Sequence, residues 1–530
     1  MANEVNKMAK FSTKEKKYPT EVNEMGEKAY KLSDKENLVD SVLTTFLQDG
    51  YYEKEKTKVD NILRSADKCD AEFVAKLALY ARKEANMRSV SHLLAGYLAS
   101  RISGKEYARR FYRNICNRPD DMAEILAYYK SKEHKGKMPN AMRSGFKSYM
   151  EGLDAYQIDK YKMKGRTFSL KDLANLCHIK PTQKNEEAYN RLFNGESLDD
   201  LYDSNILNKA LTATEGDDEL KGEVFRQQLE EGMPIFALLR NLVNIATYSP
   251  DQVDLAVEQL TNKKAILKSK ILPFRFGTAY SEVDKRLSYS GSSIKFEEGR
   301  SIKKKLMDAL EVAIGYSVEN IPVLKGNTAI LIDHSGSVRW DVYGDSKVSA
   351  FSKTTTAHIG NLFGAMYGYA QDNVYIGLFG DRLIEVPIDR SIGVLEFNKK
   401  SYGIGAKCGG GTENGLYEFL STCIKEKTRV DTLIIFSDMV IGNGGTGGWD
   451  RTSSYHKYGN FQTLFKEFKK LNPQCLTVSI NIMATGGKSV FDRSLNVMQI
   501  SGWSERIFDQ ITGASIGHDA VIKEVEKIVL

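Results

Sequence analysis

Apolar residues recur at helical spacing through most of the first 320 residues. Residues 73–81, 93–98 and 235–243 each place apolar side chains three or four positions apart, which marks one face of a helix. Strand-like alternation is scarce, and connections such as 117–120 are short and polar, with an Asp able to cap the next helix. This pattern predicts stacked antiparallel helix pairs, that is, a helical solenoid of degenerate repeats.

After Gly326 the pattern changes to short apolar runs of buried-strand length. Four runs are expected as strands: 328–333, 374–379, 432–436 and 476–482. Three helical patterns lie between them: 347–370, 413–426 and 459–470. Alternating apolar strands and helices predict an α/β domain with a doubly wound, mostly parallel sheet, whose ligands bind at the carboxyl ends of the strands.

The two patterns divide the chain into three segments. We expect a polar arm at 1–30, a helical-repeat domain at 31–325 and the α/β domain at 326–530. A chain of 530 residues is too long for one core, and its 42% hydrophobic and 27% charged residues are typical of folded proteins. The predicted fold class is therefore α plus α/β.

The net charge of +6 is unevenly distributed. From Gly326 onward 21 Lys and Arg balance 21 Asp and Glu, so the remaining 54 against 48 put the whole excess in residues 1–325. A polyanionic partner is therefore expected to meet the helical part, although so small an excess also suits an ordinary soluble surface.

Targeting and redox signals are absent from the sequence pattern. The first thirty residues lack a signal peptide, and no apolar run is long enough to span a bilayer. The six cysteines are scattered without C-x-x-C pairs or zinc-ligand spacing, which favours reduced thiols. We expect a cytoplasmic protein without a membrane partner.

The most specific local motif follows the first predicted strand. Asp333, Ser335 and Ser337 alternate along one loop, and Thr412 and Asp438 follow later strand ends. Carboxylate and hydroxyl oxygens suit a hard divalent cation, of which Mg²⁺ is the expected one. Taken alone, the pentapeptide is equally explained as a turn in which Asp and Ser bind backbone N–H groups.

These five residues resemble the metal-ion-dependent adhesion site of von Willebrand A-type domains, over residues 326–530. The resemblance implies a site that binds rather than catalyses. In that family the metal leaves one coordination position for an acidic group of a protein partner.

Three upstream motifs resemble the Ro ribonucleoprotein family of bacterial or phage type, whose helical part is the TROVE module. They are residues 172–181 (DLANLCHIKP), 232–242 (GMPIFALLRNL) and 271–275 (ILPFR). The resemblance implies a ring of HEAT-like helix pairs closed by the A-type domain. It also implies binding of small noncoding Y-like RNA outside, and of single-stranded ends of misfolded RNA through the ring. A scaffold in RNA quality control, with an exoribonuclease as possible partner, is the implied role.

Basic residues between two predicted helices are the first candidates for RNA contact. They are Lys160, Lys162, Lys164 and Arg166, followed by His178 and Lys180. Several cations neutralise phosphates, but such a run is also typical of a solvated surface, and a lone His is often structural. The resemblance places Lys160, Lys164 and His178 at Y RNA contacts.

Spacing along the sequence indicates two further basic groups and one polar pair. Arg109 and Arg113 interleave with aromatic residues, which can either stack on bases or form core. Arg143 and Lys147 lie four apart on one helical face, where they can line the ring. Arg240 and Asn241, in an apolar helix, are expected as a buried polar pair that ties neighbouring repeats together.

Two competing functions remain open at this point. A Mg²⁺-dependent phosphoesterase would use Asp333 and Asp438 with His334 as base, but carboxylates for a second metal are missing. A protein-adhesion module with no intrinsic RNA role is the stronger alternative. We expect no enzyme activity and no DNA partner.

Overall fold

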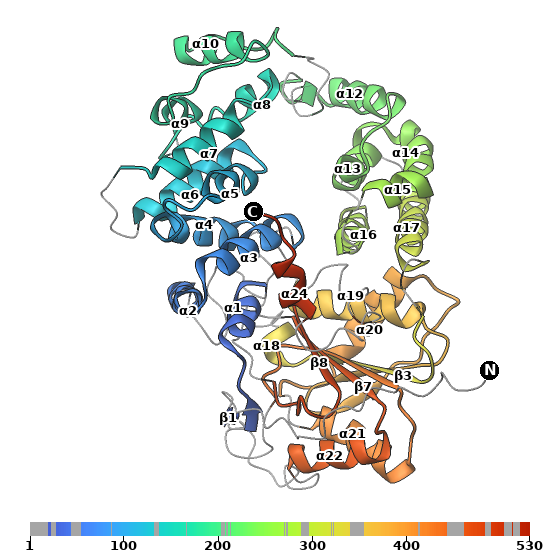
Figure 1. Cartoon of the computed structure of the whole chain (residues 1–530). Coiled ribbons are helices and arrows are strands. Elements are labelled where there is room, and N and C mark those ends of the chain that lie inside the picture. Colours follow the sequence, from blue (N-terminus) through green and yellow to red (C-terminus); the bar gives the residue numbers. More distant parts are fainter. Residues whose placement is uncertain are drawn as a thin grey trace, which may run out of the picture.

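The computed structural model describes residues 20–22, 28–43, 55–85, 87–131, 137–165, 167–202, 207, 210–211, 214–269, 271, 274–287, 296–319, 321, 323–339, 355–411, 414–441, 460–482, 489–502, 511 and 520–530. Helices rise along one side of the molecule, descend along the other and meet an α/β domain, so the chain follows a ring-like course (Figure 1). The predicted fold class is confirmed.

Two helical arms form the upper part of the ring. The first arm contains α1 (Asp34–Leu43), α2 (Glu55–Asp67), α3 (Ala71–Lys83), α4 (Ser89–Arg101), α5 (Ala108–Asn114), α6 (Pro119–Ser131), α7 (Asn140–Met150), α8 (Ala155–Lys160), α9 (Leu170–Leu176) and α10 (Glu186–Asn194). The second contains α12 (Asp218–Glu230), α13 (Ile235–Tyr248), the short 3₁₀ helix η1 (Pro250–Gln252), α14 (Val253–Leu260), α15 (Lys263–Ser269), α16 (Phe274–Arg286) and α17 (Phe296–Glu319). None of the described helices is both long and apolar enough to cross a bilayer.

The α/β domain is built on six strands in the order β5-β4-β3-β6-β7-β8. They are β3 (Thr328–Asp333), β4 (Val374–Phe379), β5 (Leu383–Glu385), β6 (Thr432–Ser437), β7 (Leu476–Asn481) and β8 (Val497–Ser501). All neighbours pair in parallel except β5, which runs antiparallel to β4. Because β4 and β6 lie on opposite sides of β3, the chain reverses direction across the sheet at β3, where doubly wound sheets bind ligands.

Helices cover both faces of this sheet. They are α18 (Gly336–Arg339), α19 (Thr356–Tyr369), α20 (Val394–Gly405), α21 (Gly415–Glu426) and α22 (Phe461–Leu471). Ile330 and Ile332 of β3 share a core with α19 and with the second helical arm, whereas Leu331 faces the core under α21 and α22. Gly364 lets α19 approach β3, since a Cβ there would lie 2.4 Å from Cδ1 of Ile332.

The first described segments of the chain dock on the α/β domain. The antiparallel pair β1 (Thr20–Val22) and β2 (Lys28–Tyr30) ends at Tyr30, whose N–H donates to the carbonyl of Ser489 at 2.9 Å. In α1, the buried carboxylate of Asp40 accepts hydrogen bonds from Asn481 at 3.0 Å and Ser501 at 2.6 Å, at the carboxyl ends of β7 and β8. The end of the expected polar arm therefore packs on the α/β domain.

The last described helix follows the α/β domain in the sequence but packs on the first helical arm. In α24 (Ala520–Glu526), Val521 and Val525 lie in the core of the first helical arm. Lys35 forms an ion pair with Glu526 at 2.6 Å, and Arg110 donates to the carbonyl of Leu530 at 3.1 Å. Packing thus crosses the predicted boundary at residue 326 in both directions.

The Asp40 contact makes the stability of this junction depend on pH. Burial raises the pKa of Asp40 to about 6 from 3.8, although the hydrogen bonds from Ser501 and Asn481 lower it. The folded protein therefore holds a proton that the unfolded chain loses above about pH 4, so Asp40 lowers stability progressively from pH 4 to pH 6. At about 1.4 kcal/mol per pKa unit, up to about 3 kcal/mol is involved.

We expect Asp40→Asn, which cannot ionise, to gain up to about 3 kcal/mol over wild type between pH 4 and pH 7, with no further gain above. Urea unfolding at several pH values measures the difference. Asp254→Asn, at a carboxylate whose side chain is 76% exposed, is the control. A difference that does not change with pH would contradict the prediction.

Candidate metal site and RNA-binding surface

Two adjacent parallel strands bring the predicted metal ligands together. Asp333 ends β3 and Ser437 ends β6, with Asp438 directly after it. Ser437 Oγ donates to Asp333 Oδ2 at 2.6 Å, and Ser337 Oγ donates to Asp438 Oδ2 at 2.5 Å. The hydroxyl oxygens of Ser335 and Ser337 lie 3.2 Å apart. Four of the five predicted ligands therefore converge.

The fifth predicted ligand, Thr412, lies outside the described residues. The preceding loop does reach the site, because the N–H of Gly336 donates to the carbonyl of Gly410 at 2.9 Å. Ser437, which is not among the five predicted ligands, binds Asp333 directly.

The backbone fixes the two carboxylates. The N–H of Ser335 donates to Asp333 Oδ1 at 2.8 Å, and the N–H of Val440 donates to Asp438 Oδ1 at 3.0 Å. Met439, between Asp438 and Val440, adopts a left-handed φ of 62°, a conformation that non-glycine residues rarely take. Such local strain is typical of functional sites.

The site concentrates negative charge in a buried place. Asp333 and Asp438 are both fully buried. Burial, and next the charge of Asp438, raise the pKa of Asp333 to about 7. No group of three or more His, Cys, Asp and Glu side chains at metal-binding distances occurs in the described ranges. The donor set thus consists of two carboxylates completed by hydroxyls, which fits a hard divalent cation.

His334 is turned away from these carboxylates. Its Nδ1 lies 3.1 Å from Nη1 of Arg339, and its Nε2 lies 3.0 Å from Oδ1 of Asn361. A guanidinium only donates, so Nδ1 accepts and Nε2–H donates, and the imidazole is neutral. Gly405 leaves room for the ring, since a Cβ there would lie 2.0 Å from Nδ1. Both ring nitrogens of the general base nominated for a phosphoesterase are therefore engaged with Arg339 and Asn361.

Lys160 lies at the end of α8 among aromatic rings. It is exposed, donates to the hydroxyl of Tyr156 at 2.8 Å, and lies 5.1 and 5.8 Å from the ring centroids of Tyr156 and Tyr161. Arg118, which directly precedes α6, lies 5.3 Å from the centroid of the Tyr161 ring. No local pattern in the sequence indicates this cluster of cations and tyrosines, because Arg118 is more than forty positions from Lys160.

The other candidates near α8 and α9 differ in exposure. Lys164, His178 and Lys180 are exposed, and His178 has a left-handed φ of 50° just after α9. Lys162 forms an ion pair with Asp159, which offsets its charge. Arg166 lies outside the described residues.

The residues on α5 and α7 divide between core and surface. Phe111 and Tyr112 are fully buried, so the aromatic residues between Arg109 and Arg113 form core, as the alternative reading expected. The two arginines themselves are exposed.

Arg143 and Lys147 are half-buried on α7. Burial raises the pKa of the Cys177 thiol to about 12, and the positive charges of Arg143 and Lys147 oppose that shift. Both therefore lie close to the end of α9, where His178 follows.

The predicted pair Arg240 and Asn241 does not link repeats, so that expectation was wrong. Arg240 is exposed, and Asn241 donates to the carbonyl of Ala237 in its own helix at 2.9 Å. The buried face of α13 carries Leu238 and Leu242 instead. Residue 240 falls on the opposite side of the helix.

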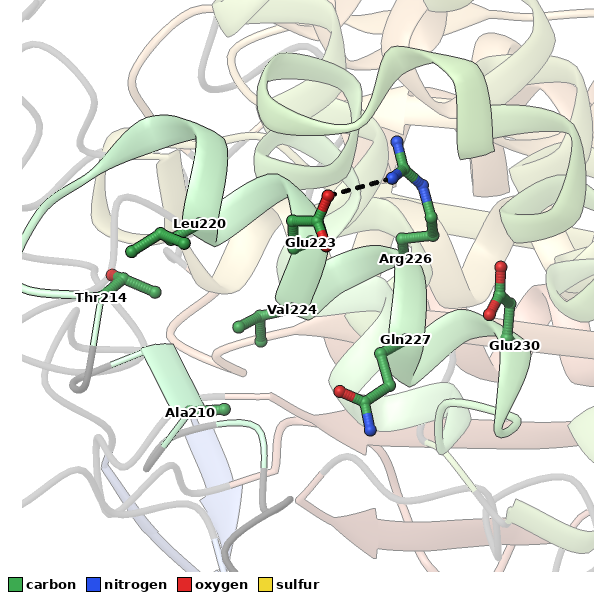
Figure 2. A pocket seen from close by; sticks show the side chains of 8 residues that line it. All are labelled: Ala210, Thr214, Leu220, Glu223, Val224, Arg226, Gln227 and Glu230. Atoms are coloured by element: carbon green, nitrogen blue, oxygen red, sulfur yellow. Dashed lines mark hydrogen bonds and ion pairs between the residues drawn. The ribbon is translucent and has the colours of Figure 1, made fainter.

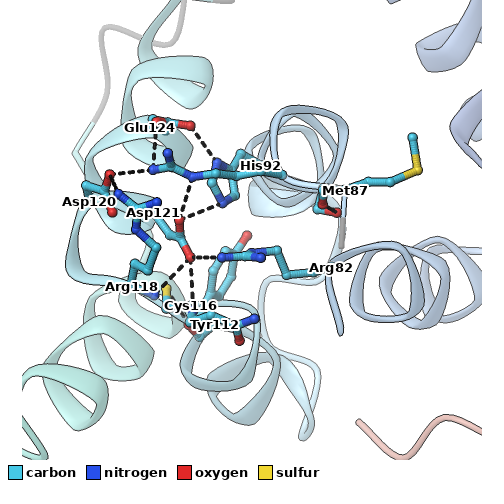
Figure 3. Close-up of polar contacts among 12 residues, drawn as sticks. Arg82, Met87, His92, Tyr112, Cys116, Arg118, Asp120, Asp121 and Glu124 are labelled. Atoms are coloured by element: carbon cyan, nitrogen blue, oxygen red, sulfur yellow. Dashed lines mark hydrogen bonds and ion pairs between the residues drawn. The ribbon is translucent and has the colours of Figure 1, made fainter. Parts of the chain in front are cut away.

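Close to Arg118, ion pairs join α3, α4 and α6 around the buried carboxylate of Asp121 (Figure 3). Arg118 itself pairs with Asp120 at 2.9 Å, so it connects this network to Tyr161. The network supports the surface on which Lys160 lies.

A cavity of about 340 Å³ beside α12 has different chemistry (Figure 2). Glu223 and Glu230 line it, and Arg226 pairs with Glu223 at 3.3 Å. One net negative charge does not favour a polyanion, so we assign no RNA contact there.

A model of the TROVE domain matches residues 3–210 and 218–293, more than half of the chain. The telomerase protein component 1 of Rattus norvegicus is 21% identical over 317 residues, and that of Mus musculus is 22% identical over 317 residues. These matches cover 45% of this chain but only 12% of each relative.

A solved structure shares the fold. The crystal structure of the Deinococcus radiodurans RO (RSR) protein aligns with a TM-score of 0.55 at 14% identity, covering 91% of this chain and 99% of that one. The likeness therefore includes both the helical arms and the α/β domain. With the family model matched over most of the helical part, the chain belongs to the TROVE family.

Proposed function

We propose that the chain binds small, structured noncoding RNA of the Y-like kind through Lys160, Lys164 and His178, and takes up single-stranded ends of misfolded RNA. In this proposal it is a non-enzymatic cytoplasmic scaffold for RNA quality control. The observation that carries the proposal is the exposed cluster at α8. Among the described residues, the contacts of Lys160 are with tyrosines rather than with a carboxylate, so its charge is available to phosphate.

The α/β domain adds a second binding function to this proposal. Asp333, Ser335, Ser337 and Asp438 would hold a divalent cation, with Mg²⁺ as the best fit, and Thr412 is the proposed fifth ligand. Such an ion supplies a Lewis-acidic position for a carboxylate of a protein partner. A partner exoribonuclease is one such protein. Ser437 and the backbone N–H groups keep the carboxylates oriented for this role.

A pure adhesion module is the second candidate, supported by the convergence of buried oxygens at β3 and β6. It leaves the match of the TROVE model to the helical part unexplained. We therefore propose that RNA and protein binding coexist on separate parts of the ring.

The RNA proposal is tested with Lys160→Ala/His178→Asn, in which Asn tolerates the left-handed backbone at 178. Fluorescence anisotropy with a labelled RNA stem containing an internal loop should show about tenfold weaker binding near 0.15 M salt. The log–log salt slope should fall by about 1, since about one phosphate contact is lost.

Lys264→Ala/Lys268→Ala, at two exposed lysines of α15 in the other arm, is the matched control and should bind like wild type. Affinity unchanged in the Lys160/His178 variant would reject the proposed surface. Absence of any salt-sensitive RNA binding by wild type would reject the RNA function itself.

A further inference from the structure

Exposed carboxylates are concentrated on and around α12, in contrast to the rest of the helical part. From Glu215 to Glu231 the chain has seven Asp and Glu against two Lys and Arg, and all seven acidic side chains are exposed. The other residues up to 325 have 41 Asp and Glu against 52 Lys and Arg. An acidic surface therefore interrupts a basic domain, which disfavours RNA or an anionic membrane there and favours a cationic partner.

Only some of these carboxylates stabilise the helix itself. Asp217 caps the first turn of α12, and Asp218 pairs with Lys221 at 2.7 Å. Glu230 and Glu231 instead lie at the end of the helix, where the helix dipole is negative, and no basic residue occupies the last turn. Glu230 takes part in no ion pair with any residue in the described ranges. A positive charge from outside would therefore stabilise this end of α12.

An apolar ridge lies between the charged ends of α12. The buried face of the helix carries Phe225, whereas Leu220 is 51% exposed and Val224 is half-buried. A single exposed leucine needs no explanation by itself. Leu220 and Val224, however, line the cavity of about 340 Å³, together with Ala210 and Thr214. The cavity can therefore receive an apolar side chain.

Apolar and acidic groups meet at this cavity. In Figure 2, Leu220 and Val224 lie toward one end of it and Glu230 toward the other. Leu220, Val224 and Gln227 recur at helical spacing, so they form a ridge against which another helix can pack. From Glu219 to Glu230 the helix rises about 16 Å at 1.5 Å per residue. A partner helix of about three turns would therefore reach a carboxylate at each end.

We propose that this acidic surface of α12 docks a basic amphipathic helix of a partner protein. Apolar side chains of the partner enter the cavity beside Leu220 and Val224, and its Lys or Arg side chains pair with Glu219 and Glu230. Recognition of a helix in a groove uses such apolar anchors, while charges at the rim set orientation and association rate. In Figure 1, α12 lies at the end of the second arm farthest from the α/β domain, so this surface is separate from the metal site.

Fluorescence anisotropy with a labelled Leu/Lys peptide of about fourteen residues tests the surface on the full chain near 0.15 M salt. The peptide has all its leucines on one helical face and is long enough to cover α12. Wild type should bind it, and Leu220→Ala should bind it about tenfold more weakly, because an apolar anchor loses its contact. Glu219→Gln/Glu230→Gln should weaken binding about threefold and reduce its salt dependence.

Two matched controls make the same kinds of change elsewhere on the second arm. Leu267→Ala shortens a 41% exposed apolar side chain of α15, and Glu258→Gln neutralises an exposed carboxylate of α14. Both should bind the peptide like wild type. A peptide of equal composition with alternating Leu and Lys has no apolar helical face and should bind wild type about tenfold more weakly.

Three results would overturn the proposal: no binding of the amphipathic peptide by wild type, equal binding of the alternating peptide, or equal peptide binding by wild type and Leu220→Ala. The looped stem used for Lys160 should bind Leu220→Ala like wild type, since the docking surface is not an RNA surface. If Leu220→Ala instead weakened binding of that RNA, or dissociated a wild-type dimer in sedimentation, with peptide binding unchanged, the surface would belong to RNA or to a second copy of the chain.

Discussion

Replacing Asp121 by Ala is expected to destabilise the first helical arm by about 3–5 kcal/mol, the usual result of removing one partner from a buried charge network. The carboxylate is fully buried and accepts hydrogen bonds from Arg82 at 2.8 Å and Arg88 at 2.9 Å. His92 Nε2 lies 3.3 Å away, and the N–H of Asn117 donates at 2.9 Å. Ala would leave these donors buried without their acceptor.

The pH dependence of this effect follows from the Asp121 pKa. Burial raises it, but the hydrogen bonds and charges of His92 and Arg82 outweigh burial and hold the pKa well below its usual range. A carboxyl with a depressed folded pKa stabilises the fold above its unfolded value of about 4 and loses that contribution as pH falls further. The cost of Asp121→Ala should therefore be present above about pH 5 and shrink in strong acid.

Urea unfolding followed by far-UV circular dichroism measures the Asp121 effect. Asp200→Ala is the matched control, because Asp200 pairs with Arg191 at the surface and its removal should leave the midpoint unchanged. A midpoint for Asp121→Ala equal to that of wild type would show that the network contributes nothing.

Magnesium is expected to stabilise wild type by about 2.7 kcal/mol at a hundred times its Kd, and to leave Asp333→Asn unaffected. The variant loses a charged ligand, which we expect to weaken the site at least a hundredfold. Without metal, the variant should melt at or above the wild-type temperature at pH 8, because the amide removes the repulsion between Asp333 and Asp438.

Protons should compete with the ion. Since the pKa of Asp333 is raised to about 7, the metal-free protein carries a proton there below pH 7 that a cation must displace. Magnesium affinity should therefore fall up to about tenfold per pH unit below 7 and level off above it.

Thermal melting across a magnesium series at pH 6, 7 and 8 checks both statements. Asp389→Asn, at an exposed carboxylate of the same domain, should respond to magnesium like wild type. If magnesium stabilised wild type and Asp333→Asn equally, these residues would not be its binding site.

The convergence of the metal ligands was predictable from the sequence, because parallel strands end at one edge of a sheet. The apolar runs at 328–333 and 432–436 located β3 and β6, and Asp333 and Asp438 follow from their ends. The antiparallel edge strand β5 was not predicted, since three residues carry no periodicity.

Predictions elsewhere failed for two reasons. The sequence did not show which side of a helix faces solvent, and it does not encode contacts between residues far apart along the chain. Polar residues in an apolar helix suggested a buried pair, but α13 has a solvent face that carries Arg240. The contact of Asp40 with Ser501 joins residues 461 positions apart, and no local pattern encodes it. Arg118 and Tyr161 meet for the same reason only in the folded chain.

Residues 28–43 pack on the α/β domain, and α24 packs on the first helical arm. This arrangement has a consequence for a chain that is cut. A single break between α17 and β3 would therefore produce two pieces that each hold a segment of the other, in addition to the core that the second arm shares with α19. We expect such a nicked molecule to migrate as one particle under native conditions and to come apart only when the cores themselves melt.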